Sequence, residues 1–258
     1  MEYLPALLLS SALAGLALWR RALTLGGTLL AFALCLLITA VGGVTAFAVL
    51  TVTLLGTVAA DRFAGERKDP LSVRRKSGSR DAVRVGCNVG LAGGAMLLYA
   101  LTGKDGFFIA YAGVMAESLA DSLASKLGPP SKAPPRDFCT FRPIPPGLSG
   151  GVSLIGTASE LLGAAIIAGV FALGTGRGNV ILVITAAGFL GAMFDSLLGS
   201  RAQAKYRCPV CGQITERESH CGEAALLFSG VKWMNNDAVN FLSNLFSLLL
   251  AYLLANCI

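Results

Sequence analysis

The chain has 258 residues, of which 54% are hydrophobic and only 14% charged, with a formal net charge of +6 and a mean hydropathy of +0.67. A soluble domain carries about 25% charged residues, so this composition excludes an ordinary soluble protein. It predicts an all-α polytopic membrane bundle, because a transmembrane β-barrel would show alternating segments of about ten residues.

Hydrophobic runs close to the ~20 residues that a helix needs to cross the hydrocarbon core predict about eight spans in one transmembrane domain, residues 1–258. The first span is flanked by Glu2 and followed by Arg20 and Arg21, so it lacks a basic leader and is expected to be an anchor rather than a signal peptide. In chain order the spans are 3–19, 22–40, 43–60, 82–101, 106–126, 151–173, 178–200 and 230–255.

The distribution of basic residues predicts the orientation of these spans. Of the 21 Lys and Arg residues, only Lys104 and Arg177 lie in the even-numbered connections. By the positive-inside rule the odd-numbered connections are cytoplasmic and both termini lie outside, in what we expect to be a prokaryotic cell membrane. The basic residues are spread over four loops, which disfavours nucleic acid as a partner but could attract anionic headgroups or a nucleotide. A homo-oligomer is compatible with the sequence.

Three long connections lie on the predicted cytoplasmic side, whereas the outer connections, such as Gly42-Gly43, are very short. Functional loops are therefore expected inside. Residues 61–81 are basic, residues 127–150 are rich in Pro and Gly, and residues 201–229 contain a cysteine cluster.

Four acidic residues interrupt the apolar spans: Glu117, Asp121, Glu160 and Asp195. A charged side chain at the centre of a membrane helix costs at least about 2.5–3.5 kcal/mol, so four at similar depth predict a polar site. Asp121 and Asp195 should lie about 8 Å below the inner surface, and Glu117 and Glu160 about 14 Å below it. Carboxylates at the water-facing end of a bundle suit Mg²⁺ and phosphates. The alternative is that they pair with Lys or Arg for packing.

Further polar groups surround this predicted site. Ser122 and Lys126 follow Asp121 on its helix, and Ser196 follows Asp195 in a similar Asp-Ser-Leu sequence. Lys76, Arg80 and, on the fourth span, Asn88 could contact phosphate groups, although positive-inside flanking would also explain the two cations. On the eighth span Asn236, Asn240 and Asn244 share one helix face beside Asp237, as residues four apart do; contacts between helices are the alternative there.

A glycine-rich segment from Pro145 to Thr157 leads directly into the sixth span. Backbone N–H groups at a helix N-terminus bind anions, and glycine lets a phosphate approach the backbone, so Gly150, Gly151 and Ser153 are candidates for phosphate binding. The segment is not a Walker A loop, because no Gly-Lys-Ser/Thr follows. A flexible turn before a helix is the alternative.

The cysteine cluster consists of Cys208-Pro209-Val210-Cys211 and His220-Cys221. A Cys-x-x-Cys pair with a second ligand pair resembles a small structural Zn²⁺ site, and a cytoplasmic location disfavours disulfides. Adjacent residues do not easily bind one ion together, so the sequence leaves open whether His220, Cys221 or both complete the site.

Five blocks together resemble an integral membrane family, formerly of unknown function, that includes the plant phytyl-phosphate kinase of vitamin E synthesis. This family is distantly similar to CTP-dependent polyprenol kinases and cytidylyltransferases. The blocks are Arg20-Arg21-Ala22-Leu23-Thr24, Ala120-Asp121-Ser122, Pro145 to Thr157, Phe194 to Gly199 with Gln203, and Asn235-Asn236-Asp237-x-x-Asn240. The chain departs from the family pattern at Leu148-Ser149, where Thr-Asn is expected, and at Lys126.

The resemblance implies transfer of the γ-phosphate of a nucleoside triphosphate, with CTP as the candidate, to a prenyl monophosphate. Asp121 and Asp195 would then hold Mg²⁺, with Glu117 and Glu160 assisting. Two alternatives remain open at this point: a cytidylyltransferase that uses the same Mg²⁺ and nucleotide, and a transporter that uses intramembrane carboxylates for ions. Transporter sites lie near the membrane midplane, whereas these acids gather toward one face, which favours an enzyme.

Overall fold

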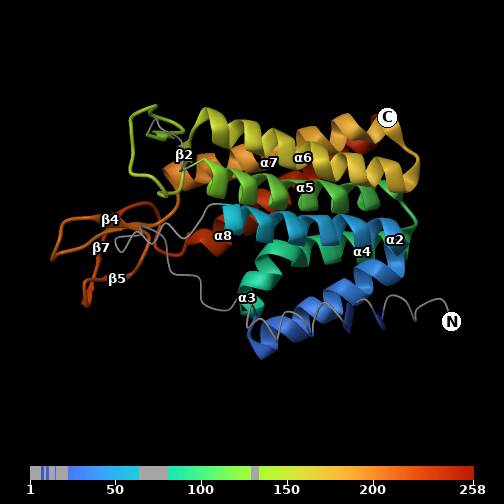
Figure 1. The fold of residues 1–258 in the computed structure, drawn as a ribbon, viewed down its shortest axis with the longest axis horizontal. Helices are drawn as coiled ribbons and strands as arrows, with labels where there is room; N and C mark the ends of the chain where they lie inside the picture. Colours follow the sequence, from blue (N-terminus) through green and yellow to red (C-terminus); the bar gives the residue numbers. More distant parts are fainter. Residues whose placement is uncertain (1–6, 9, 12–14, 16–22, 64–80, 129–133) are drawn as a thin grey trace.

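A computed structural model of the protein describes residues 7–8, 10–11, 15, 23–63, 81–128 and 134–258. It is a bundle of long helices with small β-elements gathered at one end and the C-terminus at the other (Figure 1). Within the described residues six helices are long and apolar enough to cross a membrane, which confirms the predicted all-α polytopic class. The predicted first span, 3–19, lies largely outside the described residues.

The first long helix, α2 (Leu25–Phe63), contains two of the predicted spans. Gly43 has φ 60° and ψ −152°, a conformation that favours glycine, and the helix bends there into two limbs (Figure 1). The predicted short connection at Gly42-Gly43 is therefore a sharp bend rather than a loop. The fourth span begins as α3 (Ala82–Val85), passes through a π-helical turn (Gly86–Gly90) and continues as α4 (Leu91–Thr102).

Four further helices complete the bundle. They are α5 (Asp105–Leu127), α6 (Leu154–Thr175), α7 (Ile181–Arg201), which follows a short 3₁₀ turn (Gly178–Val180), and α8 (Asn236–Ala255). The eighth helix thus begins later than predicted, because residues 230–235 belong to the preceding loop. At the short α4–α5 and α6–α7 connections, α4 ends at Gly103 and α6 ends at Gly176, both in the left-handed conformation that terminates helices.

The helix α5 lies at the centre and packs against α2, α4, α6, α7 and α8. Small residues allow this close packing: a Cβ atom added at Gly188 of α7 would lie 2.5 Å from the Cβ of Ala116, and one at Gly163 of α6 would lie 2.9 Å from the Cα of Ala120. Small residues at helix contacts are typical of membrane bundles. The outer faces expose large apolar side chains, such as Leu173 and Leu182, as expected for contact with lipid.

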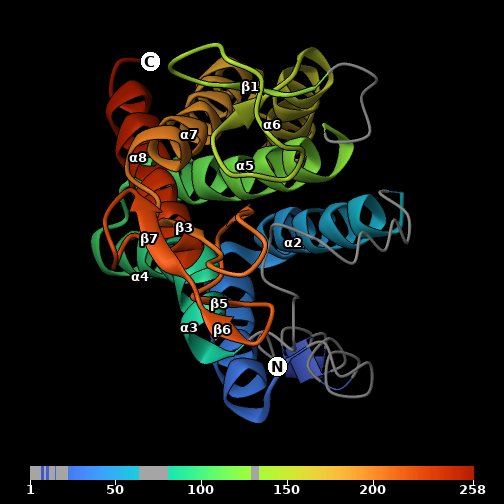
Figure 2. The same cartoon turned by 90° about the vertical axis from the view of Figure 1, so that its left-hand side faces the viewer.

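The β-elements form two groups at the same end of the bundle (Figure 2). In the α5–α6 connection β1 (Arg136–Asp137) pairs with β2 (Gly151–Val152). The α7–α8 connection contains an antiparallel sheet of order β4-β3-β7 and a hairpin, β5-β6. These strands are β3 (Lys205–Arg207), β4 (Ile214–Thr215), β5 (Ser219–His220), β6 (Glu223–Ala224) and β7 (Leu226–Ser229).

Candidate functional site

A pocket of about 60 Å³ lies where α5, α6 and α7 meet the α5–α6 connection. Three of the four membrane acids, Asp121, Glu160 and Asp195, line it. Each of them lies about 9 Å along its helix from the end that faces the β-elements. Glu160 therefore lies nearer its helix end than the predicted depth of about 14 Å, because α6 begins at Leu154 rather than at residue 151. As predicted, the three acids come together from three separate helices.

Glu160 has an unsatisfied oxygen atom in this pocket. Its side chain is only 4% exposed, and its Oε2 atom is buried without a hydrogen-bond partner. A buried carboxylate oxygen is costly unless something pairs with it. Carboxylate oxygens are the ligands that Mg²⁺ prefers, and one or two of them with phosphate oxygens and waters complete its shell. Asp121, Glu160 and Asp195 fit that donor set.

The glycine-rich segment forms the opposite wall of the pocket, which includes Gly150, Gly151 and Ser153. Gly150 has φ +81°, and a Cβ atom there would lie 2.2 Å from the backbone nitrogen of Ser200 at the end of α7. Only glycine allows this approach. Ser153 then caps α6, and its Oγ accepts a hydrogen bond from Gly156 N at 3.1 Å. The loop and the N-terminus of α6 therefore lie at the same pocket.

Asp137 of β1 ties this loop to the end of α7. Its carboxylate accepts hydrogen bonds from Thr140 N at 2.8 Å, from Cys139 N at 3.2 Å and from Ser200 Oγ at 2.8 Å. Burial alone would raise the pKa of Asp137, but these hydrogen bonds outweigh it and hold the pKa below its ordinary value. The carboxylate therefore remains charged and anchors the loop.

A second connection joins the glycine-rich loop to the α7–α8 connection. Ser149 N donates a hydrogen bond of 2.7 Å to Glu216 Oε1. Lys205 of β3 is 7% exposed and interacts with both Glu216 and Asp137. Burial lowers the pKa of Lys205, and the two carboxylates oppose that shift. Asp137, Glu216 and Lys205 were not predicted from the sequence, because short irregular loops give no periodic signal.

Behind the pocket, α8 supplies a polar layer. Ser243 Oγ donates to Glu117 Oε1 at 2.7 Å and lies 3.4 Å from Asp195 Oδ2. Glu117 is only 2% exposed and does not line the pocket, so this predicted site residue lies behind Asp195 rather than at the pocket surface. Ser243 was not predicted, although it shares the helix face of Asn236 and Asn240 at the spacing that could have revealed it.

The predicted asparagines meet across helices. Asn240 Nδ2 lies 3.1 Å from Asn88 Oδ1, and with its amide turned over it would donate to Asp195 Oδ2 at 3.3 Å. Asn236 Nδ2 lies 3.4 Å from Asn240 Oδ1. Asp237 forms an ion pair with Arg84, in which Nε and Oδ1 are 3.5 Å apart. In either orientation Asn240 lies between Asn88 and Asp195, so these side chains form a polar seam between α8 and the fourth span, next to Asp195 of α7.

Other predicted site residues lie elsewhere. Lys126 Nζ pairs with Asp61 Oδ1 of α2 at 2.6 Å, and neither Lys126 nor Ser122 is part of the pocket lining. Ser196 does line it. Lys76 and Arg80 lie outside the described residues.

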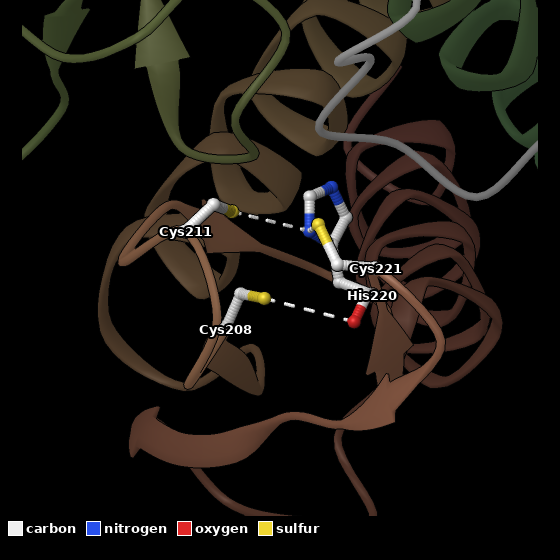
Figure 3. A group of neighbouring side chains, drawn as sticks. All are labelled: Cys208, Cys211, His220 and Cys221. Atoms are coloured by element: carbon white, nitrogen blue, oxygen red, sulfur yellow. Dashed lines mark hydrogen bonds between the residues drawn. The ribbon is translucent and has the colours of Figure 1, made fainter.

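The four predicted zinc ligands also come together, on the two hairpins of the α7–α8 connection (Figure 3). One ligand atom from each of Cys208, Cys211, His220 and Cys221 lies within 4.8 Å of all the others. Adjacent His220 and Cys221 thus both face the same point.

Comparisons with known proteins place this architecture in a family. The family described as integral membrane protein DUF92 matches residues 8–248. Protein PGR of Arabidopsis thaliana is 28% identical over 92% of this chain and 91% of its own length. An uncharacterised membrane protein of Methanocaldococcus jannaschii is 34% identical over 42% of this chain and 47% of its own length. No solved structure is a significant match. Because the family match extends over nearly all of the spans and both loops described above, the chain belongs to the DUF92 family of integral membrane proteins.

Proposed function

We propose that this protein is a membrane-embedded phosphotransferase that passes the γ-phosphate of a nucleoside triphosphate, with CTP as the candidate, to an isoprenoid monophosphate. One observation carries the proposal. Three carboxylates from separate helices face a glycine-rich loop and a helix N-terminus in a single pocket at one end of the apolar bundle. In this proposal that end faces the cytoplasm, where nucleotides are available.

The pocket calls for a cation before it can accept phosphate. The described lining contains three carboxylates and neither Lys nor Arg, so phosphate groups alone would be repelled. Asp121 and Asp195 would hold Mg²⁺ and Glu160 would assist. When bound, Mg²⁺ would neutralise the negative charge that phosphoryl transfer spreads over the phosphate oxygens. Lys76 and Arg80 remain candidates for further phosphate contacts.

The residues of the chain would act mainly by positioning. Gly150, Gly151 and Ser153 would bind a phosphate group, helped by the positive end of the α6 dipole. The attacking oxygen of a monophosphate is already anionic near neutral pH, so the reaction needs no strong general base. The only histidine of the chain belongs to the cysteine cluster, which agrees with that expectation.

The size of the pocket limits what it would hold. A volume of about 60 Å³ suits a few water molecules or a phosphate group with a hydrated ion, whereas drug-sized ligands occupy roughly 300–1,000 Å³. The base of the nucleotide and the lipid would therefore extend beyond it. Leu154 and Ile155, 92% and 51% exposed, follow Ser153 directly on α6. A prenyl tail could lie along this apolar face while its phosphate enters the pocket.

A labelling experiment tests the proposal. Purified protein is incubated with Mg²⁺, a panel of prenyl monophosphates, and CTP or ATP labelled at either the γ- or the α-phosphate. Transfer of γ-label into the lipid supports a kinase. Release of that label in pyrophosphate, with α-label in the lipid, would instead identify a cytidylyltransferase. Absence of any transfer, with solute movement in sealed vesicles, would identify a transporter.

A further inference from the structure

The cysteine cluster lies outside the pocket, and two observations indicate that it is built to hold an ion. Its ligands come from two separate hairpins (Figure 3). Cys208 and Cys211 belong to the β3–β4 turn, His220 ends β5, and Cys221 begins the β5–β6 turn. The Nδ1 atom of His220 lies 3.5 Å from Cys211 Sγ and 3.3 Å from Cys221 Sγ. In a tetrahedral site with Zn–S of about 2.3 Å and Zn–N of about 2.0–2.1 Å, the N···S edge is about 3.6 Å.

The backbone explains how adjacent residues can face one point. Successive side chains of an extended strand point to opposite faces, which would separate His220 from Cys221. Here Cys221 and Gly222 have φ 55° and φ 84°, so the hairpin turns through two left-handed residues and the alternation is broken. A cysteine is not a residue that such a turn prefers, since a positive φ strains most side chains other than glycine, asparagine and aspartate. The turn therefore holds Cys221 in a strained backbone conformation in which its side chain faces the cluster.

The first hairpin holds the other pair in a similar way. Gly212 N donates to Cys208 O, and Cys208 N donates to Gln213 O, both at 3.0 Å. Gly212 itself has φ +72°. This turn brings Cys208 and Cys211 to the same side of the β3–β4 hairpin.

The ligand set and the surroundings favour Zn²⁺ in a structural role. Three sulfurs and one nitrogen in a tetrahedral arrangement are typical of structural zinc sites, which use all four positions for protein ligands. The β5–β6 hairpin has little packing of its own, because Ser219, Glu223 and Ala224 are all exposed. Small segments without a core of their own commonly need such a cross-link.

The cross-linked segment also reaches the pocket. Glu216 lies between the two ligand pairs in the sequence, and its Oε1 accepts the hydrogen bond from Ser149 N in the glycine-rich loop. We propose that Cys208, Cys211, His220 and Cys221 bind one structural Zn²⁺, and that this ion keeps Glu216 in position to hold the glycine-rich loop. Glu216 is then a positioning residue. The zinc site and the positioning role of Glu216 would both stand even if the pocket does not transfer phosphate.

The metal is tested on full-length protein purified without metal-affinity chromatography. Elemental analysis should find one zinc per chain. Cys208→Ser and Cys221→Ser should lose it, whereas Cys257→Ser, at an exposed cysteine outside the cluster, should retain it. Cobalt added to zinc-free wild-type protein should give the thiolate charge-transfer and tetrahedral absorption bands, a test that needs no variant to fold. Wild-type protein without zinc and with freely titrating cluster thiols, or with stoichiometric iron instead, would overturn the assignment.

The positioning of the loop is tested by hydrogen exchange over residues 147–153. Removing zinc, or changing Glu216→Ala, should speed exchange of this peptide several-fold. The Glu216→Gln protein with zinc bound should instead keep the slow exchange of the wild type, because the amide oxygen can still accept the hydrogen bond. Glu223→Ala, an exposed acid of the β5–β6 hairpin, is the matched control and should change nothing. Slow exchange in both the zinc-free and the Glu216→Ala protein would show that the ion does not act through Glu216.

Discussion

Ser243 of α8 donates its hydroxyl proton to Glu117 of α5 at 2.7 Å while lying 3.4 Å from Asp195 of α7. One hydroxyl thus stands between two carboxylates from different helices, one of which lines the pocket. The single proton of this hydroxyl is donated to Glu117 at the shorter distance, so Ser243 links Glu117 to Asp195. Groups of this kind behind a metal ligand orient it and tune its affinity.

We therefore expect Ser243→Ala to weaken Mg²⁺-dependent activity by about 10–100-fold, mainly through a higher Mg²⁺ requirement. Ser247→Ala is the control, since Ser247 lies one turn further along α8 and donates to Gly113 O, away from the pocket. Activity measured as a function of Mg²⁺ concentration distinguishes the two variants. An unchanged Mg²⁺ dependence in Ser243→Ala would mean that the hydroxyl does not support Asp195.

The acids of the pocket should be essential individually. Asp121→Asn and Asp195→Asn each remove the charge and keep the shape, so both proteins should fold and both should lose at least about 10²–10³-fold in turnover. Asp105→Asn is a suitable control, because Asp105 pairs with Arg177 at the start of α5, far from the pocket. Near-normal turnover of either pocket variant at low Mg²⁺ would remove that carboxylate from the proposed ligand set.

The sequence predicts much of the site because membrane helices obey simple rules. Charge inside an apolar span is costly, so the depth of Asp121, Glu160 and Asp195 along three helices was enough to predict that they meet. Helix periodicity likewise placed Asn236 and Asn240 on one face of α8. The Cys-x-x-Cys spacing indicated the first pair of the cysteine cluster.

What the sequence could not predict depends on contacts between distant segments. Lys126 was expected at the pocket, but it pairs with Asp61, whose position depends on how α2 packs against α5. The link from Ser149 to Glu216 joins two irregular loops, and no periodic pattern specifies such a pair. The joint participation of His220 and Cys221 depends on a backbone conformation that the residue type does not favour.

Because Gly150 lies against the end of α7, we expect alanine at Gly150 to destabilise the protein more than alanine at Gly147. Gly147→Ala and Gly150→Ala both place alanine at a positive φ, of +87° and +81°, but only at Gly150 would the new Cβ meet the backbone of Ser200. The first should cost about 1–2 kcal/mol, or a few degrees in Tm. The second should cost clearly more and should also abolish activity. Equal Tm values for the two variants would contradict the packing described for this loop.

Asp137 predicts a pH-dependent contribution to stability. Its hydrogen bonds hold its pKa below the ordinary value in the folded protein, so its contribution is present above the unfolded pKa of about 3.9 and is lost as the pH falls through the folded pKa. Asp137→Asn should therefore lower Tm at pH 7, since hydrogen bonds to a charged group contribute about 1.5–3 kcal/mol each. The gap to wild type should close as the pH falls below about 4.

Thermal unfolding in detergent between pH 7 and acid measures this gap. Asp137 and Glu216 both interact with the buried Lys205, and Asp137→Asn removes one of these two carboxylates. The loss of stability at neutral pH should be larger for that reason. Asp105→Asn serves again as the control, because its ion pair with Arg177 is half-exposed and should contribute at most about 1 kcal/mol. A Tm difference for Asp137→Asn that stays constant down to acid pH would show that the charge of Asp137 does not anchor the loop.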